Sequence, residues 1–129
     1  MGNGTSIGQV RGHGSAHEGA HHWIVQRYTA LGNVVLVSWL IASLLMVGDF
    51  SYAAMTGWLS HPVNAAAMIL LVVSTFWHAR LGLQVLIEDY VPDTLNRFLL
   101  LSFLNMAVFG GGGLAILSVL KIALGVGAA

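Results

Sequence analysis

The sequence predicts an all-α membrane protein with three transmembrane helices. Hydrophobic residues make up 57% of the chain and charged residues only 8%, whereas roughly 25% of the residues in a soluble domain are charged. Three apolar stretches, residues 30–47, 63–87 and 98–120, are long enough to cross a hydrocarbon core of about 30 Å as helices. No stretch alternates like a membrane β-strand, and helices satisfy every backbone group inside lipid.

The first segment, residues 1–22, is rich in Gly, His and Ser and has no apolar run. It fits neither a secretory signal nor an Arg-rich mitochondrial transit peptide. We expect a flexible cytoplasmic tail, of which residues 1–20 are dispensable for haem and quinone binding because their glycines and lack of apolar residues offer nothing to pack.

Two short patterns occur in this tail. Met1-Gly2 with Ser6 fits the myristoylation pattern, but three spans already anchor the chain. Residues 17–21 spell the H-E-x-x-H of zinc proteases, which needs a stable helix and a third ligand. Gly19 weakens any helix that could carry the second pattern. We therefore interpret both patterns as chance matches, the first because the spans already anchor the chain and the second because its helix is weak.

Residues 23–129 form the predicted three-helix membrane anchor domain, with helices at about 28–48, 62–89 and 96–122. Polar or helix-breaking residues bound each helix. These are Arg27 and Gly48-Asp49 for the first, His61-Pro62 and Glu88-Asp89 for the second, and Arg97 and Lys121 for the third.

The positive residues predict the orientation in the membrane. Arg11 and Arg27 precede the first helix and Arg97 follows the second, while the loop of residues 48–62 has no Lys or Arg. The positive-inside rule therefore places the N-terminus and the second loop in the cytoplasm, with Lys121 as the one opposing residue.

Composition also excludes several function classes. The net charge is zero and no basic stripe is present, so nothing indicates nucleic-acid binding. Because the chain has no cysteine, it supplies no disulfide, no Fe–S ligand and no thiolate zinc site. Three spans leave little chain for a water-side core, so soluble chemistry belongs to a partner.

His78 lies deep inside the second apolar stretch, where an ionisable side chain is costly and usually functional. Helical spacing aligns it with Gly82 one turn further on. Because Gly82 has no side chain, it leaves a gap on this face. The gap would let a broad flat group such as a b-type haem approach the helix while the His78 imidazole coordinates the metal of that group. The alternative is a histidine hydrogen-bonded to a neighbouring helix, and spacing alone leaves both open.

Two other features of the helices favour structural roles. Arg80 is about 200° round the helix from His78, so it cannot share that face and is expected to snorkel or to pair with another subunit. The run Gly110 to Gly113 permits close helix approach. We favour packing of this run against a partner chain over a kink or a local break.

Two motifs carry a resemblance to a known family. His78-Ala79-x-x-Gly82 followed by Asp89-Tyr90-Val91 resembles the signature of the D-type hydrophobic membrane anchor of succinate dehydrogenase, respiratory complex II. His22-Trp23 with Arg27 looks like the element that precedes the first helix in that family.

The resemblance implies half of a heterodimeric haem-binding helix bundle. A second anchor subunit, of cytochrome b type, would share one haem b, with His78 as one axial ligand to its iron. Tyr90 would hydrogen-bond ubiquinone beside Asp89, and Arg27 and Gly82 complete the expected cofactor-binding set. The flavoprotein and iron–sulfur subunits would pass electrons from succinate to the quinone, so this subunit would catalyse nothing alone.

Two other functions remain open at this point. A cytochrome b subunit of another quinone oxidoreductase would explain His78, although it would usually have more than one intramembrane histidine. A non-haem structural three-helix assembly subunit would use His78 only for packing. For the location we expect a bacterial inner membrane, with the mitochondrial inner membrane as the alternative.

Overall fold

The computed structural model describes residues 17–125, and within that range the chain is entirely helical apart from short connections. The helices are α2 (His17–Val47), α3 (Tyr52–Ser60), α4 (Pro62–Tyr90) and α5 (Thr94–Ala123). Three of them, α2, α4 and α5, are long and apolar enough to cross a membrane, which confirms the predicted all-α membrane class.

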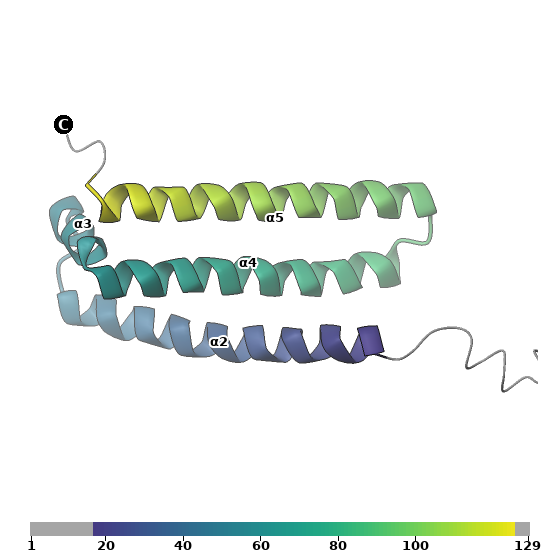
Figure 1. Ribbon diagram of the computed structural model, residues 1–129, viewed down its shortest axis with the longest axis horizontal. Helices are drawn as coiled ribbons and strands as arrows, with labels where there is room; N and C mark the ends of the chain where they lie inside the picture. The colour runs from purple at the N-terminus through teal and green to yellow at the C-terminus, as the bar shows by residue number, and fades with distance from the viewer. Residues whose placement is uncertain (1–16, 126–129) are drawn as a thin grey trace, which may run out of the picture.

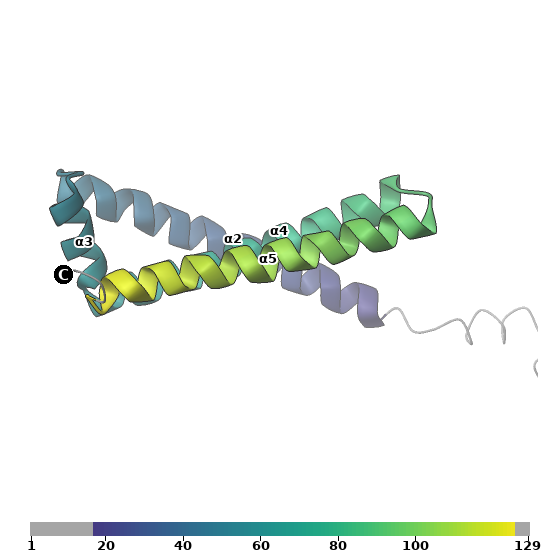
Figure 2. The same ribbon diagram turned by 90° about the horizontal axis from the view of Figure 1, so that it is seen from above.

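Helix α4 lies between the other two long helices and packs against both of them (Figure 1). Helices α4 and α5 run side by side in opposite directions, while α2 crosses the pair at an angle (Figure 2). The first turns of α2 and the α4–α5 connection lie at one end of the bundle, and α3 lies at the other. The two predicted cytoplasmic regions therefore share one end.

Helix α2 begins earlier than the sequence suggested. It starts at His17, so the expected tail of residues 1–22 overlaps the helix by its last six residues, and the H-E-x-x-H segment is helical. The glycine at position 19 costs only about 1 kcal/mol, which a helix of 31 residues can absorb. The myristoylation pattern and the rest of the tail lie outside the described residues.

A short helix, α3, occupies the loop that joins the first two spans. Gly48 ends α2 with a φ of +67°, and the Ser51 hydroxyl then caps α3 by accepting the Ala54 N–H at 3.3 Å. The Asp49 carboxylate accepts the Ser51 N–H at 2.9 Å and its O–H at 2.8 Å. These two bonds lower the pKa of the Asp49 carboxyl below its ordinary value.

Trp58 holds α3 against the end of α2. Its indole N–H donates to the Ser43 hydroxyl at 2.7 Å, and its ring stacks on Trp39 with the two centroids 5.8 Å apart. Both contacts join residues that are far apart in the sequence, so tertiary packing rather than local propensity accounts for α3.

Few hydrophobic side chains within residues 19–125 are buried, and those that are lie on two helices only. Within residues 19–125, α2 contributes none. The buried hydrophobic residues are Ala65, Leu71 and Leu81 on α4 and Leu104, Val108 and Val119 on α5. The α4–α5 pair therefore forms the core. Helix α2 packs on the surface of this pair and has no buried residue of its own within residues 19–125.

The glycine run of α5 packs against α4 of the same chain. A Cβ atom at Gly111 would lie 3.1 Å from the Phe76 ring, and one at Gly112 would lie 3.5 Å from it. At Gly110 and Gly113 a Cβ would meet nothing within 4 Å. Helix α5 is unbroken through the run, so a local break is ruled out, and half of the run serves Phe76 rather than another chain.

This contact makes Gly111 sensitive to added volume. We expect Gly111→Val to lower the thermal stability of the detergent-purified native complex, by about 1–3 kcal/mol of overpacking, because its methyl groups would enter the space of the Phe76 ring. Gly110→Val, on a face with no neighbour within 4 Å, is the matched control. Equal thermal midpoints for the two variants would contradict the role assigned to Gly111.

Candidate functional site

His78 is half-buried on the face of α4 that meets α2. Its Nδ1 atom lies 3.1 Å from the Thr29 hydroxyl oxygen. That hydroxyl is also 2.9 Å from the Val25 carbonyl oxygen and 3.0 Å from the Gln26 carbonyl oxygen. In the described part of the chain, His78 Nε2 has no hydrogen bond. The histidine thus makes the bond to a neighbouring helix that the sequence offered as the alternative to haem ligation, and one of its ring nitrogens stays without a partner among residues 17–125.

Other polar side chains continue this contact along the two helices. The Ser74 hydroxyl donates to the Thr29 carbonyl oxygen at 3.3 Å, and the Thr75 hydroxyl donates to Asn33 Oδ1 at 3.4 Å. We call the set Thr29, Asn33, Ser74, Thr75 and His78 the polar seam. Hydrogen bonds of this kind join helices in lipid, where hydrophobic burial gives little drive for association.

Gly82 also faces α2. A Cβ atom at this position would lie 3.8 Å from Gln26 Nε2, which is an ordinary van der Waals distance. Packing within residues 17–125 therefore does not require glycine at position 82. The space that the sequence suggested beside His78 is bordered by the Gln26 side chain.

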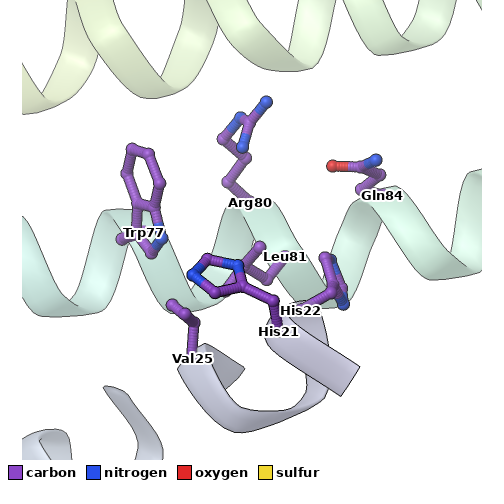
Figure 3. A pocket seen from close by; sticks show the side chains of 7 residues that line it. All are labelled: His21, His22, Val25, Trp77, Arg80, Leu81 and Gln84. Carbon is purple, nitrogen blue, oxygen red and sulfur yellow. The ribbon is translucent and has the colours of Figure 1, made fainter. Parts of the chain in front are cut away.

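A recess of about 710 Å³ lies between α2 and α4, next to the polar seam (Figure 3). Apolar and polar side chains from both helices line it. They are His21, His22, Val25, Trp77, Arg80, Leu81 and Gln84. His22 Nε2 is buried there without a hydrogen-bond partner among the described residues. The family resemblance includes His22, but the sequence did not indicate the recess, because the recess depends on how α2 crosses α4.

A second, almost wholly apolar recess of about 470 Å³ lies on the other side of Trp77. Val25 and Trp77 line both recesses, and Thr29 and Ser74 of the polar seam line this one. Open apolar space therefore flanks the α2–α4 contact near His78.

Arg80 points away from His78 toward α5. Its Nε donates to Asn105 Oδ1 at 2.7 Å, and its guanidinium carbon is 5.3 Å from the centroid of the Trp77 ring. The expected separation of the His78 and Arg80 faces is confirmed. The charge finds its partners within this chain, as an intramembrane cation requires.

Of the remaining expected site residues, Arg27 lies on α2 between Gln26, which is next to Gly82, and Thr29, which is next to His78. The Arg27 guanidinium stacks over the Trp23 ring at 5.1 Å. Asp89 and Tyr90 end α4, and the Tyr90 side chain is 78% exposed. Tyr90 is 12 residues beyond His78, or about 18 Å along the helix, so the structure places the two at different depths.

The connection after Tyr90 is tightly held. Arg97 Nε donates to the Val91 carbonyl oxygen at 3.0 Å, and Arg97 Nη2 donates to the Pro92 carbonyl oxygen at 3.3 Å. The Asp93 carboxylate caps α5 by accepting the Asn96 N–H at 2.8 Å. The end of α4 is therefore fixed relative to the start of α5.

No group of three or more His, Asp or Glu side chains that could hold a metal ion occurs in the part of the chain that the structure describes.

Known proteins resemble this chain over most of its length. A family model described as succinate dehydrogenase/fumarate reductase transmembrane subunit matches residues 1–112. The succinate dehydrogenase hydrophobic membrane anchor subunit of Rickettsia bellii (strain RML369-C) is 35% identical over 87 residues, covering 67% of this chain and 70% of the relative. No solved structure matches.

Two further relatives carry the same description. The subunit of Rickettsia conorii (strain ATCC VR-613 / Malish 7) is 36% identical over 88 residues, 67% of this chain and 70% of the relative. That of Coxiella burnetii (strain RSA 493 / Nine Mile phase I) is 27% identical over 96 residues, 74% of this chain and 84% of the relative.

Proposed function

Because this chain belongs to the family of succinate dehydrogenase/fumarate reductase transmembrane subunits, we propose that its α2–α4 contact and the end of α4 serve electron transfer to a quinone. As a membrane anchor subunit of complex II, it holds the flavoprotein and iron–sulfur subunits at the membrane and catalyses nothing alone. The family match favours this function over a subunit of another quinone oxidoreductase.

The first part of the proposal is that His78 is one axial ligand of a haem b shared with a second anchor subunit. The free Nε2 of this half-buried histidine carries the proposal, since its Nδ1 is already occupied by Thr29. An imidazole nitrogen without a hydrogen-bond partner is a donor that haem iron accepts, so the ring of His78 fits a haem, although His78 lines neither recess beside Trp77. A bound haem would supply one-electron storage within the membrane.

The second part concerns the quinone. Tyr90 ends α4 and is exposed, so its ring can lie against an apolar quinone tail while its hydroxyl donates to a carbonyl oxygen. Asp89, which is also exposed, can exchange protons with water. Ubiquinone is the expected substrate, and Arg27 of α2 completes the expected cofactor-binding set from the level of His78 and Gly82.

The third part is the orientation. Arg27 and Arg97 both lie toward the end of the bundle that contains the α4–α5 connection, and the positive-inside rule assigns that end to the cytoplasm. The soluble subunits would dock there, next to Tyr90. The Rickettsia and Coxiella relatives support a bacterial cytoplasmic membrane over a mitochondrial inner membrane.

Purification of the native complex in mild detergent tests the haem proposal. We expect the flavoprotein, the iron–sulfur subunit and a second anchor subunit to co-purify, with a b-type band in the dithionite-reduced difference spectrum. If all four chains are identified by mass spectrometry without a stoichiometric haem, the anchor is a non-haem structural subunit and the proposal fails.

A further inference from the structure

Thr29 is placed to control the chemistry of His78. We infer that Thr29 is a positioning residue that holds the His78 imidazole with its proton on Nδ1 and its lone pair on Nε2. This inference rests on the proposed function, because it concerns how His78 presents itself to iron. The residue spacing within α2 or α4 does not indicate the contact between Thr29 and His78, since these two residues are 49 positions apart in the sequence.

The hydrogen-bond partners of the threonine hydroxyl determine which group donates. Its oxygen lies 2.9 Å from the Val25 carbonyl and 3.0 Å from the Gln26 carbonyl of its own helix. A threonine in a helix donates its proton to such a carbonyl. The hydroxyl can then only accept from His78, so Nδ1 carries the hydrogen and Nε2 is the unprotonated nitrogen.

The backbone around Thr29 is also held against α4. Its carbonyl oxygen accepts the Ser74 hydroxyl at 3.3 Å. One turn further along α2, a Cβ atom at Gly32 would lie 3.4 Å from the same Ser74 oxygen, so the two helices approach closely here. Hydrogen bonds therefore hold both the main chain and the side chain of Thr29. A residue held in this way can set the orientation of the His78 ring.

A hydrogen bond on the second ring nitrogen changes a histidine as a metal ligand. It fixes the tautomer and the ring orientation, and it raises the basicity of the coordinating nitrogen. A more basic ligand stabilises the ferric state over the ferrous state of a haem. The Thr29 bond should therefore lower the reduction potential of the haem that His78 holds.

Three variants of the purified four-subunit complex test this inference. Thr29→Val keeps the shape and removes the hydroxyl, Thr29→Ser restores it, and Thr75→Val removes a different hydroxyl of the polar seam that bonds Asn33 at 3.4 Å. The readouts are the haem midpoint potential in a redox titration and the g values of the ferric low-spin haem in electron paramagnetic resonance.

We expect a raised midpoint potential and altered g values for Thr29→Val, with wild-type values for Thr29→Ser and Thr75→Val. Loss of haem from Thr29→Val alone would also support the inference. Equal shifts in Thr29→Val and Thr75→Val would overturn it, because they would reflect general loosening of the α2–α4 contact. Unchanged values in Thr29→Val would overturn it as well.

The test separates this inference from the function on which it rests. Wild-type complex without b haem, or His78→Ala complex with an unchanged low-spin signal, would remove the haem assignment itself. Haem that depends on His78 but is indifferent to Thr29→Val would remove only the role of Thr29.

Discussion

Replacement of His78 by alanine is expected to abolish the low-spin, bis-histidine haem signal of the native complex. Alanine has no atom that can coordinate iron, and the described part of the chain offers no other histidine on this face of α4. The hydroxyl of Thr29 keeps its bonds to the Val25 and Gln26 carbonyls. The variant loses one hydrogen bond, worth about 0.5–1.5 kcal/mol, in addition to the imidazole's packing and the haem, so the amounts of the four chains are measured to check assembly.

His61→Ala is the control for this experiment, because His61 precedes α4 and its side chain makes no capping hydrogen bond. Reduced difference spectra and paramagnetic resonance of both complexes, normalised to the amounts of the four chains, give the result. An unchanged low-spin spectrum in His78→Ala would exclude His78 as an axial ligand.

Replacement of Tyr90 by phenylalanine is expected to lower succinate:quinone reductase activity by about tenfold or more. The ring stays and only the hydroxyl is lost, so the decrease corresponds to the ~1.4 kcal/mol of one functional hydrogen bond to the quinone. Succinate oxidation with an artificial acceptor that takes electrons from the soluble subunits should stay near the wild-type rate. The assay is run below saturating quinone.

Tyr52→Phe provides the matched control. Tyr52 is 84% exposed and begins α3, at the opposite end of the bundle from Tyr90. It is a membrane-boundary tyrosine without a proposed ligand, so its phenylalanine variant should keep full activity. Equal quinone reduction by wild type and Tyr90→Phe would leave Tyr90 as an ordinary residue of the aromatic belt.

The long helices could be predicted from the sequence because each depends on properties of its own segment. Composition and the lengths of the apolar stretches indicated three spans, and the angle between His78 and Arg80 on one helix indicated separate neighbours. The structure bears out that separation, with Thr29 beside the first residue and Asn105 beside the second.

What could not be predicted depends on contacts between segments. Helix α3 has only nine residues and contains Gly57, so isolated propensity is too weak to indicate it, and its stack on Trp39 was not visible in the sequence. The Phe76 contact with Gly111 and the Thr29 bond to His78 likewise depend on how the helices cross. The His78, Tyr90, Asp89, Arg27 and Gly82 assignments stay predictions.

The uneven burial of the three long helices bears on the lifetime of the subunit in the cell. The buried hydrophobic residues found within residues 19–125 all belong to α4 and α5, and α2 reaches them through the polar seam. In lipid such contacts contribute only about 0.6–2 kcal/mol each, so a newly inserted chain should open and close at α2 until it assembles with the proposed second anchor subunit. We expect unassembled copies to be cleared by membrane proteases, which would match the amount of this subunit to the supply of its partners.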